Sequence, residues 1–189
     1  MVIAMAKDEN GSELSLGDRM RRAAILCCHL TRNLAYFRVG HAVFPAAPEG
    51  DFLLTMIGNF IDIAVLDWCT LFGNHADLQH WKQLVPETGH GAFREALRKE
   101  TGITKAAWET AWAEVKSYRD EFVAHLGSEH IMDVPNMEIP KKMVEFYYDY
   151  LRKEAPEVFF RGLPTSLADY HNVHREIAKT NYAKHLKEK

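Results

Sequence analysis

The hydrophobic positions of this chain follow the helical period of 3.6 almost throughout. In the first half they recur at intervals of three, four and seven from Asp18 to about Gly40, and a broadly apolar segment then runs from about residue 52 to Gly73. We expect the first helix to begin with Asp18 as its N-cap, because an aspartate side chain accepts hydrogen bonds from the free N–H groups of a first turn. The breadth of the second segment predicts a central place in a bundle.

Further along, residues 74–104 combine short helical patterns with turns, and Thr104 is expected to cap a long helix. No segment alternates in the manner of a β-strand. The sequence therefore predicts an all-α bundle of five or six helices, with residues 1–17 as a flexible lead-in and residues 18–189 as one domain whose C-terminal extension is 155–189. The later helices are expected at about 104–126, 140–154 and 166–186.

Composition narrows the classes of function. The 189 residues are 47% hydrophobic, which is enough for a sizeable core, and the formal net charge of −3 argues against broad adhesion to nucleic acid. Any contact with a polyanion would need a local basic surface, and the C-terminal segment is the basic part of the chain. It carries Arg175, Lys179, Lys184 and Lys187, which could also be a solvated helix face.

The expected environment is a reducing cytoplasm. The three cysteines, Cys27, Cys28 and Cys69, have neither metal-finger spacing nor an even number, so we interpret them as buried thiols. The most apolar segment contains Asn59, Asp62 and Asp67, which would be costly in lipid. We therefore expect a soluble protein without a membrane partner.

The candidate site lies on the helix that Thr104 is expected to cap. At 100° per residue, Trp108 and Trp112 lie within about 20° of Arg119, so the guanidinium falls in an apolar stripe. A charge there is costly unless it is paired or faces a polar cavity or an interface. His125 lies about 120° round from Arg119, and Asp120 points the other way, near Lys116. One helix therefore does not assemble the three groups, and a second chain would complete the site.

Residues 119–125 read RDEFVAH and resemble the R-x(4–6)-H motif of the HEPN (higher eukaryotes and prokaryotes nucleotide-binding) superfamily, including a polar residue directly after the arginine. The string RDEFVAHL is especially similar to HEPN proteins of bacterial abortive-infection systems, as is the segment WCTLFG at residues 68–73. The likeness extends loosely over residues 18–155, and its specific part is the eight-residue string.

The resemblance implies a helical bundle that dimerises with its motif helices facing each other, and a metal-independent endoribonuclease without a cofactor. It implies that Arg119 binds the scissile phosphate, that His125 is a general acid or base, and that Asp120 orients them. It also implies a role in bacterial defence or in a toxin–antitoxin type system. The expected partners are a second copy of this chain, an RNA substrate and an antitoxin protein.

Other interpretations remain open at this stage. Arg119 could be structural and paired with Asp62 or Asp67, in a non-catalytic dimeric helical module that binds RNA, nucleotide or a protein. Alternatively, Asp62 and Asp67 would line the cleft and, with Tyr118, support the site or contact substrate. Spacing alone is weak evidence for the motif. Arg22 and His29 have the spacing R-x6-H, which also falls within the R-x(4–6)-H range.

Two further clusters suggest chemistry. The pairs Glu87/His90, His75/His80 and His171/His174 have spacings seen in metal sites, but they lack the facing partners that such a site needs, so no metal is expected. The aromatic residues Phe146, Tyr147, Tyr148 and Tyr150 could stack unpaired bases or form a packing face.

Overall fold

The computed structural model describes residues 14–44, 52–123 and 133–187, and this part of the chain is helical and contains no β-strand. The predicted all-α bundle is confirmed. Within these ranges lie seven α-helices, of which α3 is a single turn. Their bounds are α1 (Leu16–Val43), α2 (Phe52–Trp68), α3 (Trp81–Leu84), α4 (His90–Thr101), α5 (Lys105–Tyr118), α6 (Glu138–Glu154) and α7 (Leu167–Lys187).

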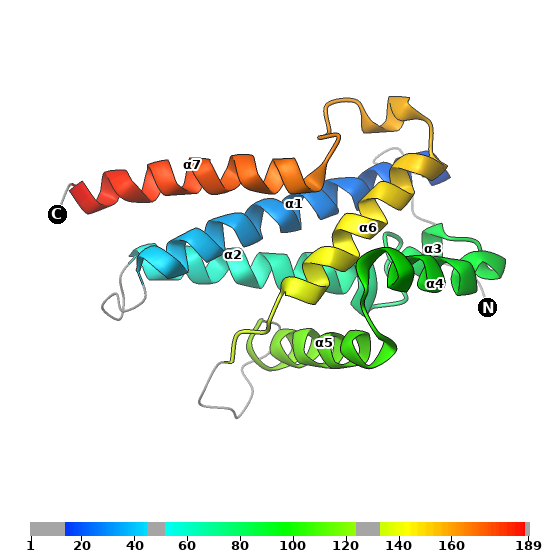
Figure 1. The fold of residues 1–189 in the computed structure, drawn as a ribbon, viewed down its shortest axis with the longest axis horizontal. Helices are drawn as coiled ribbons and strands as arrows, with labels where there is room; N and C mark the ends of the chain where they lie inside the picture. Colours follow the sequence, from blue (N-terminus) through cyan, green and yellow to red (C-terminus); the bar gives the residue numbers. More distant parts are fainter. Residues whose placement is uncertain (1–13, 45–51, 124–132, 188–189) are drawn as a thin grey trace.

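Helix α1 is the axis of the bundle. It packs along α2, which runs antiparallel to it, and along α7, which runs parallel to it on the other side (Figure 1). Helix α6 crosses α1 and packs on α4, while α5 lies against α6 and the end of α2. The stripe predicted for α1 is its core face, because Cys27, Leu30 and Leu34 have no exposed surface.

The first helix begins earlier than predicted. Ser15, not Asp18, is the N-cap of α1: its Oγ accepts a hydrogen bond from the Asp18 N–H at 3.1 Å and donates one to the Asp18 carboxylate at 2.5 Å. This reciprocal arrangement resembles a capping box, since the residue three positions after the cap bonds back to it. Leu16 and Gly17, predicted as lead-in, therefore belong to α1, and residues 1–13 lie outside the described ranges.

The aromatic cluster of α6 is a packing face. Tyr147 and Tyr148 have no exposed surface, Phe146 is 8% exposed, and the Phe93 ring lies edge-on to Phe146 with centroids 5.2 Å apart. Buried rings are not available to stack on bases, so the packing interpretation is confirmed. Tyr150, at the edge, is half-buried against Phe93.

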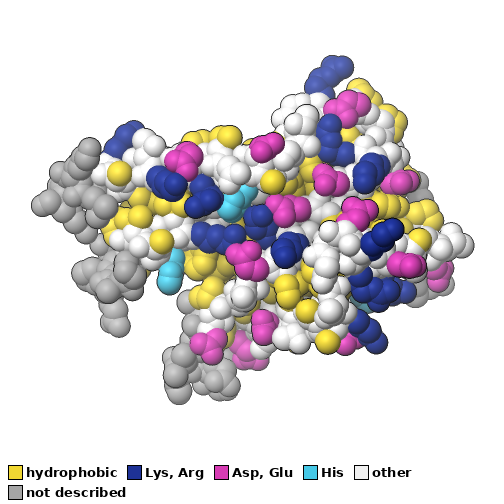
Figure 2. Space-filling model, viewed as in Figure 1, with side chains coloured by type: hydrophobic (Ala, Val, Ile, Leu, Met, Phe, Trp, Pro, Cys, Tyr) yellow, Lys and Arg dark blue, Asp and Glu magenta, His cyan; other side chains and the backbone are white. Residues whose placement is uncertain are grey.

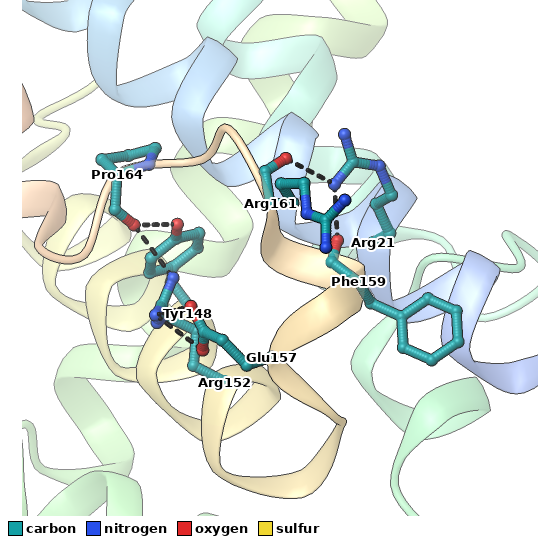
Figure 3. A network of polar contacts seen from close by, with 7 residues as sticks. All are labelled: Arg21, Tyr148, Arg152, Glu157, Phe159, Arg161 and Pro164. Atoms are coloured by element: carbon teal, nitrogen blue, oxygen red, sulfur yellow. Dashed lines mark hydrogen bonds and ion pairs between the residues drawn. The ribbon is translucent and has the colours of Figure 1, made fainter.

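The connection between α6 and α7 contains a 3-10 turn, Glu157–Phe160, and is held by polar contacts (Figure 3). Arg152 bonds the Glu157 carboxylate at 2.8 and 3.0 Å and, together with the Tyr148 hydroxyl, donates to the carbonyl of Pro164. From α1, Arg21 donates to the carbonyl of Phe159 at 2.5 Å. These bonds fix the start of the C-terminal extension against α1 and α6.

The stretch Phe52–Gly73 is the one segment of the described chain that is long and apolar enough to cross a membrane by length and composition. In the structure it packs against α1, and 44% of its most apolar window is buried inside the bundle. Two large apolar side chains on its outer face are exposed, Phe52 and Leu66.

Candidate functional site

Arg119 stands where α5 changes its helical form. The helix was expected to continue regularly to about Leu126, but residues Arg119–Val123 form a π-helical turn, η3, and the described residues of this segment end at Val123. A π turn is wider than an α turn because its bonds join residues i and i+5. His125 lies outside the described residues, so the expected angle between Arg119 and His125 stays a prediction.

A second π turn lies at the end of α2. Segment η1, Cys69–Gly73, extends α2, and the N–H of Asn74 closes it by donating to the carbonyl of Cys69 at 2.8 Å. Segment η1 packs on α5, and η3 packs on α2. The indole of Trp112 joins α5 to η1 by donating to the carbonyl of Phe72 at 3.2 Å. Such turns occur frequently at functional sites.

Arg119 is paired with its own neighbour in sequence. Its Nε donates to the Asp120 carboxylate at 2.7 Å, and a second guanidinium nitrogen bonds the same oxygen. Lys116 donates to the other carboxylate oxygen at 2.6 Å, as the helical spacing predicted. The hypothesis that Asp62 or Asp67 neutralises Arg119 is wrong, because a side chain at the start of η3 reaches the adjacent carboxylate without crossing to α2.

The electrostatics keep this cluster ionised and positive. The hydrogen bond from Lys116, followed by those from Arg119, holds the pKa of Asp120 below its ordinary value. Burial is the largest single effect and acts to lower the pKa of Arg119, but the hydrogen bond to Asp120 and the nearby charges, among them the carboxylates of Asp120 and Asp77, together outweigh it, so the pKa is raised. Two cations thus share one carboxylate, and the Arg119 side chain keeps 21% of its surface exposed. A phosphate could approach the remaining donors.

Tyr118 and Asp62 brace the site. The buried Tyr118 hydroxyl donates to Asp62 at 2.8 Å and so joins α5 to α2 one residue before Arg119. Burial, and then the bond to Asp62, raise the pKa of Tyr118, so its hydroxyl stays protonated. The bond places Asp62 close to the start of η3, and the role of these two residues as supporting groups stays a prediction.

Asp67 belongs to a different cluster. Its carboxylate lies 2.8 Å from Nδ1 of His29 on α1, and its side chain is only 10% exposed. Asp67 follows Asp62 by five residues and so lies about 140° round α2 from it. Burial raises the pKa of Asp67 to about 7 and lowers that of His29. The structure thus separates Asp67 from Arg119 and leaves a partly buried titratable pair, His29 and Asp67, between α1 and α2.

The histidine pairs are engaged elsewhere. The Nε2 atom of His90 lies 3.0 Å from the carbonyl of Val85, and Nδ1 of His174 lies 2.8 Å from the Tyr36 hydroxyl. Among the residues that the structure describes, no group of three or more His, Cys, Asp or Glu side chains is arranged to hold a metal ion. The three cysteines are buried free thiols, as predicted, and burial raises the pKa of Cys69, beside Arg119, to about 11.

Lys116 is the functional residue that sequence reasoning did not select. Its signal was the i, i+4 spacing to Asp120, which places a cation and an anion on adjacent turns. Comparison of the chain with known proteins found no matching family model, no similar curated protein and no similar solved structure. The function therefore has to be argued from the motif and from the geometry around Arg119.

Proposed function

We propose that this protein is a metal-independent HEPN-type endoribonuclease that acts as a homodimer in a bacterial defence or toxin–antitoxin type system. The proposal rests on the charge, the exposure and the hydrogen bonding of Arg119. It is a charged, partly exposed guanidinium held by the residue that follows it, at an irregular helix end, six positions before His125. The polar residue after the arginine, a feature of the motif, thus has a physical role: Asp120 orients the guanidinium.

The chemistry uses the RNA's own nucleophile. The 2′-oxygen attacks the adjacent phosphorus, the bond from phosphorus to the 5′-oxygen breaks, and the products are a 2′,3′-cyclic phosphate and a 5′-hydroxyl. Arg119 donates to the non-bridging oxygens, where negative charge develops. His125 removes the 2′-hydroxyl proton or protonates the leaving oxygen, a role that suits histidine because an unperturbed imidazole changes charge near neutral pH.

The outer face of α2 supports the dimer. Apolar side chains with helical spacing lie along it beside Asp62, interrupted by the exposed Asn59, and the end members are 77% exposed at Phe52 and 42% exposed at Leu66. Between them lie Met56 and Ile63, both half-buried. A second copy that covered this row would also approach η3, because η3 packs on α2. Burial of such a row stabilises association through the hydrophobic effect.

One observation favours the alternative, a non-catalytic dimeric helical module. Asp120 already satisfies the Arg119 guanidinium with two hydrogen bonds within the same chain. In that case Arg119 stabilises the π turn, and the protein binds RNA, nucleotide or a protein partner without cleaving it.

The test is cleavage of an RNA panel by the purified protein in excess EDTA. The proposal predicts products that end in a 2′,3′-cyclic phosphate and a 5′-hydroxyl, identified by mass spectrometry. Products with 5′-phosphates, or cleavage only with added Mg²⁺, would contradict it. Binding of the panel without cleavage would contradict it too, and would favour the non-catalytic module.

A further inference from the structure

A cavity of about 570 Å³ opens between α3, α4 and α5. This volume is in the range of small-ligand pockets, which measure roughly 300–1,000 Å³. Its wall is formed by four aromatic side chains and its rim by four cations, and Arg119 is not among the lining residues. The aromatic residues are Phe72, Trp81, Trp108 and Trp112, and the cations are Lys82, Arg94, Arg98 and Lys105.

The rim concentrates positive charge on a chain whose net charge is −3. Glu109 is the one carboxylate of the lining, and it lies 3.6 Å from Lys105. Within the described ranges, no carboxylate lies at ion-pair distance from the exposed Arg94 or Arg98, which are one turn apart on α4. Figure 2 shows Lys and Arg side chains over α4 and beside the start of α5, at the lower right. Cations without partners attract an anion such as phosphate.

The aromatic wall is rigid and partly open. Trp81 is buried and stacked on Phe93 with ring centroids 4.7 Å apart, which fixes the base of the wall. Trp108 packs edge-on against Trp81 at 6.4 Å, and Trp112 is held by its bond to the Phe72 carbonyl. Trp108 and Trp112 keep part of their surface exposed, and both line the cavity. Fixed indole faces are suited to stacking with a planar base.

The cavity and Arg119 share one face of α5. Along this helix and the residue that follows it, three cations and two tryptophans recur at intervals of three, four, four and three, which keeps them on the same side. Arg119 lies seven residues beyond Trp112, which is two turns or roughly 10 Å along the axis. The members of the row are Lys105, Trp108, Trp112, Lys116 and Arg119.

We propose that this cavity binds one unpaired nucleotide of the RNA strand whose scissile phosphate lies at Arg119. Trp108 and Trp112 stack with the base, and Arg94 and Arg98 hold a phosphate. This combination of groups favours a nucleotide. An inorganic anion would make no contact with the aromatic wall, and an apolar ligand would leave the cations unpaired. The assignment to an RNA strand rests on the proposed function, whereas a free nucleotide has the same chemistry.

The test uses a fluorescent 2′-O-methyl RNA oligonucleotide, which lacks the 2′-hydroxyl nucleophile and so reports binding without cleavage. In the double variant Arg94→Gln/Arg98→Gln we expect the Kd from fluorescence anisotropy to rise at least tenfold. The slope of log Kd against log salt should fall by about 0.7, because the contact with one phosphate is lost. The control Lys99→Gln/Lys153→Gln removes the same charge from exposed positions outside the cavity and should stay within about threefold of the native Kd.

Equal binding by the native protein and the Arg94/Arg98 variant, or an equal loss in the control, would overturn the inference. Adenosine monophosphate, added as a competitor, distinguishes the two sources of the ligand. If it displaces the oligonucleotide at a concentration near the oligonucleotide's own Kd, the cavity is a free-nucleotide site and the strand assignment fails. If binding depends on Arg94 and Arg98 but the native protein does not cleave ordinary RNA, the result counts against the proposed function alone. If the native protein cleaves RNA but the Arg94/Arg98 variant binds the oligonucleotide as tightly, the result counts against this inference alone.

Discussion

Replacing Arg119 by glutamine is expected to lower the rate of RNA cleavage by at least about 100-fold, since loss of one donor to a developing oxyanion typically costs about 10²–10³ in rate. Glutamine keeps part of the side-chain volume near Cys69 but cannot carry charge. The loss should appear mainly in kcat, because the negative charge on the phosphate grows in the transition state. The rate is measured in EDTA with a fluorogenic RNA, under saturating substrate.

Arg22→Gln is the matched control. Arg22 is exposed on α1 and stands in R-x6-H spacing to His29, one residue longer than the R-x5-H spacing of Arg119 to His125. It therefore tests whether an arginine at motif-like spacing is enough for activity outside the candidate site. We expect its cleavage rate to equal that of the native protein. A thermal melt of both variants separates loss of activity from loss of fold. If Arg119→Gln cleaves within about threefold of the native rate, Arg119 has no role at the transition state.

Asp67→Asn is expected to stabilise the protein at pH 8 by about 2–4 kcal/mol, since each pKa unit corresponds to about 1.4 kcal/mol. The pKa of the buried Asp67 is about 7 in the folded chain, whereas an exposed aspartate titrates near 4. The folded state therefore favours the protonated carboxyl, and the native protein loses stability as pH rises from about 4 through about 7. Asparagine keeps the shape and an acceptor for His29 without the charge.

The gain should shrink as pH falls, because the native carboxyl is then protonated in the folded state. Urea unfolding at pH 5 and pH 8 measures this difference. Burial lowers the pKa of His29, so both proteins lose stability when this histidine is protonated at low pH. The contribution of His29 therefore cancels in the comparison. Asp133→Asn, at an exposed position, should show no such dependence. A native protein more stable than Asp67→Asn at pH 8 would mean that Asp67 is ionised and paired with a charged His29.

The fold was predictable where one local rule decided the outcome. The stripe of Cys27, Leu30 and Leu34 identified the core face of α1, because apolar residues that recur with a 3.6-residue period lie on one side of a helix. The predicted start of α1 is wrong by a few residues. The prediction rests on Asp18 alone, although Ser15 and Asp18 together have the spacing of a reciprocal cap. The packing role of Tyr147 and Tyr148 required the structure, because the same residues suit a base-stacking surface equally well.

The site was predictable only in part. The sequence identified Arg119 and its place beside the tryptophans, but not the π turn that begins there, since such a turn has no periodic signal and is selected by packing against α2. The partner of Arg119 depends on side-chain conformation, which is why Asp120 was not preferred over Asp62 or Asp67. The cavity joins Arg94 and Arg98 of α4 to the tryptophans of α5, a pairing between separate helices that no local pattern contains.

The central claim is that Arg119 and His125 act together in RNA cleavage across two chains. The most direct test is the cleavage rate of a co-refolded equimolar mixture of the Arg119→Gln and His125→Ala variants, each inactive alone. In a mixed dimer, one composite site regains both native groups, so the mixture should recover roughly a quarter of the native rate, given random pairing. A mixture as inactive as its parts, with mixed dimers shown to form, would contradict the claim.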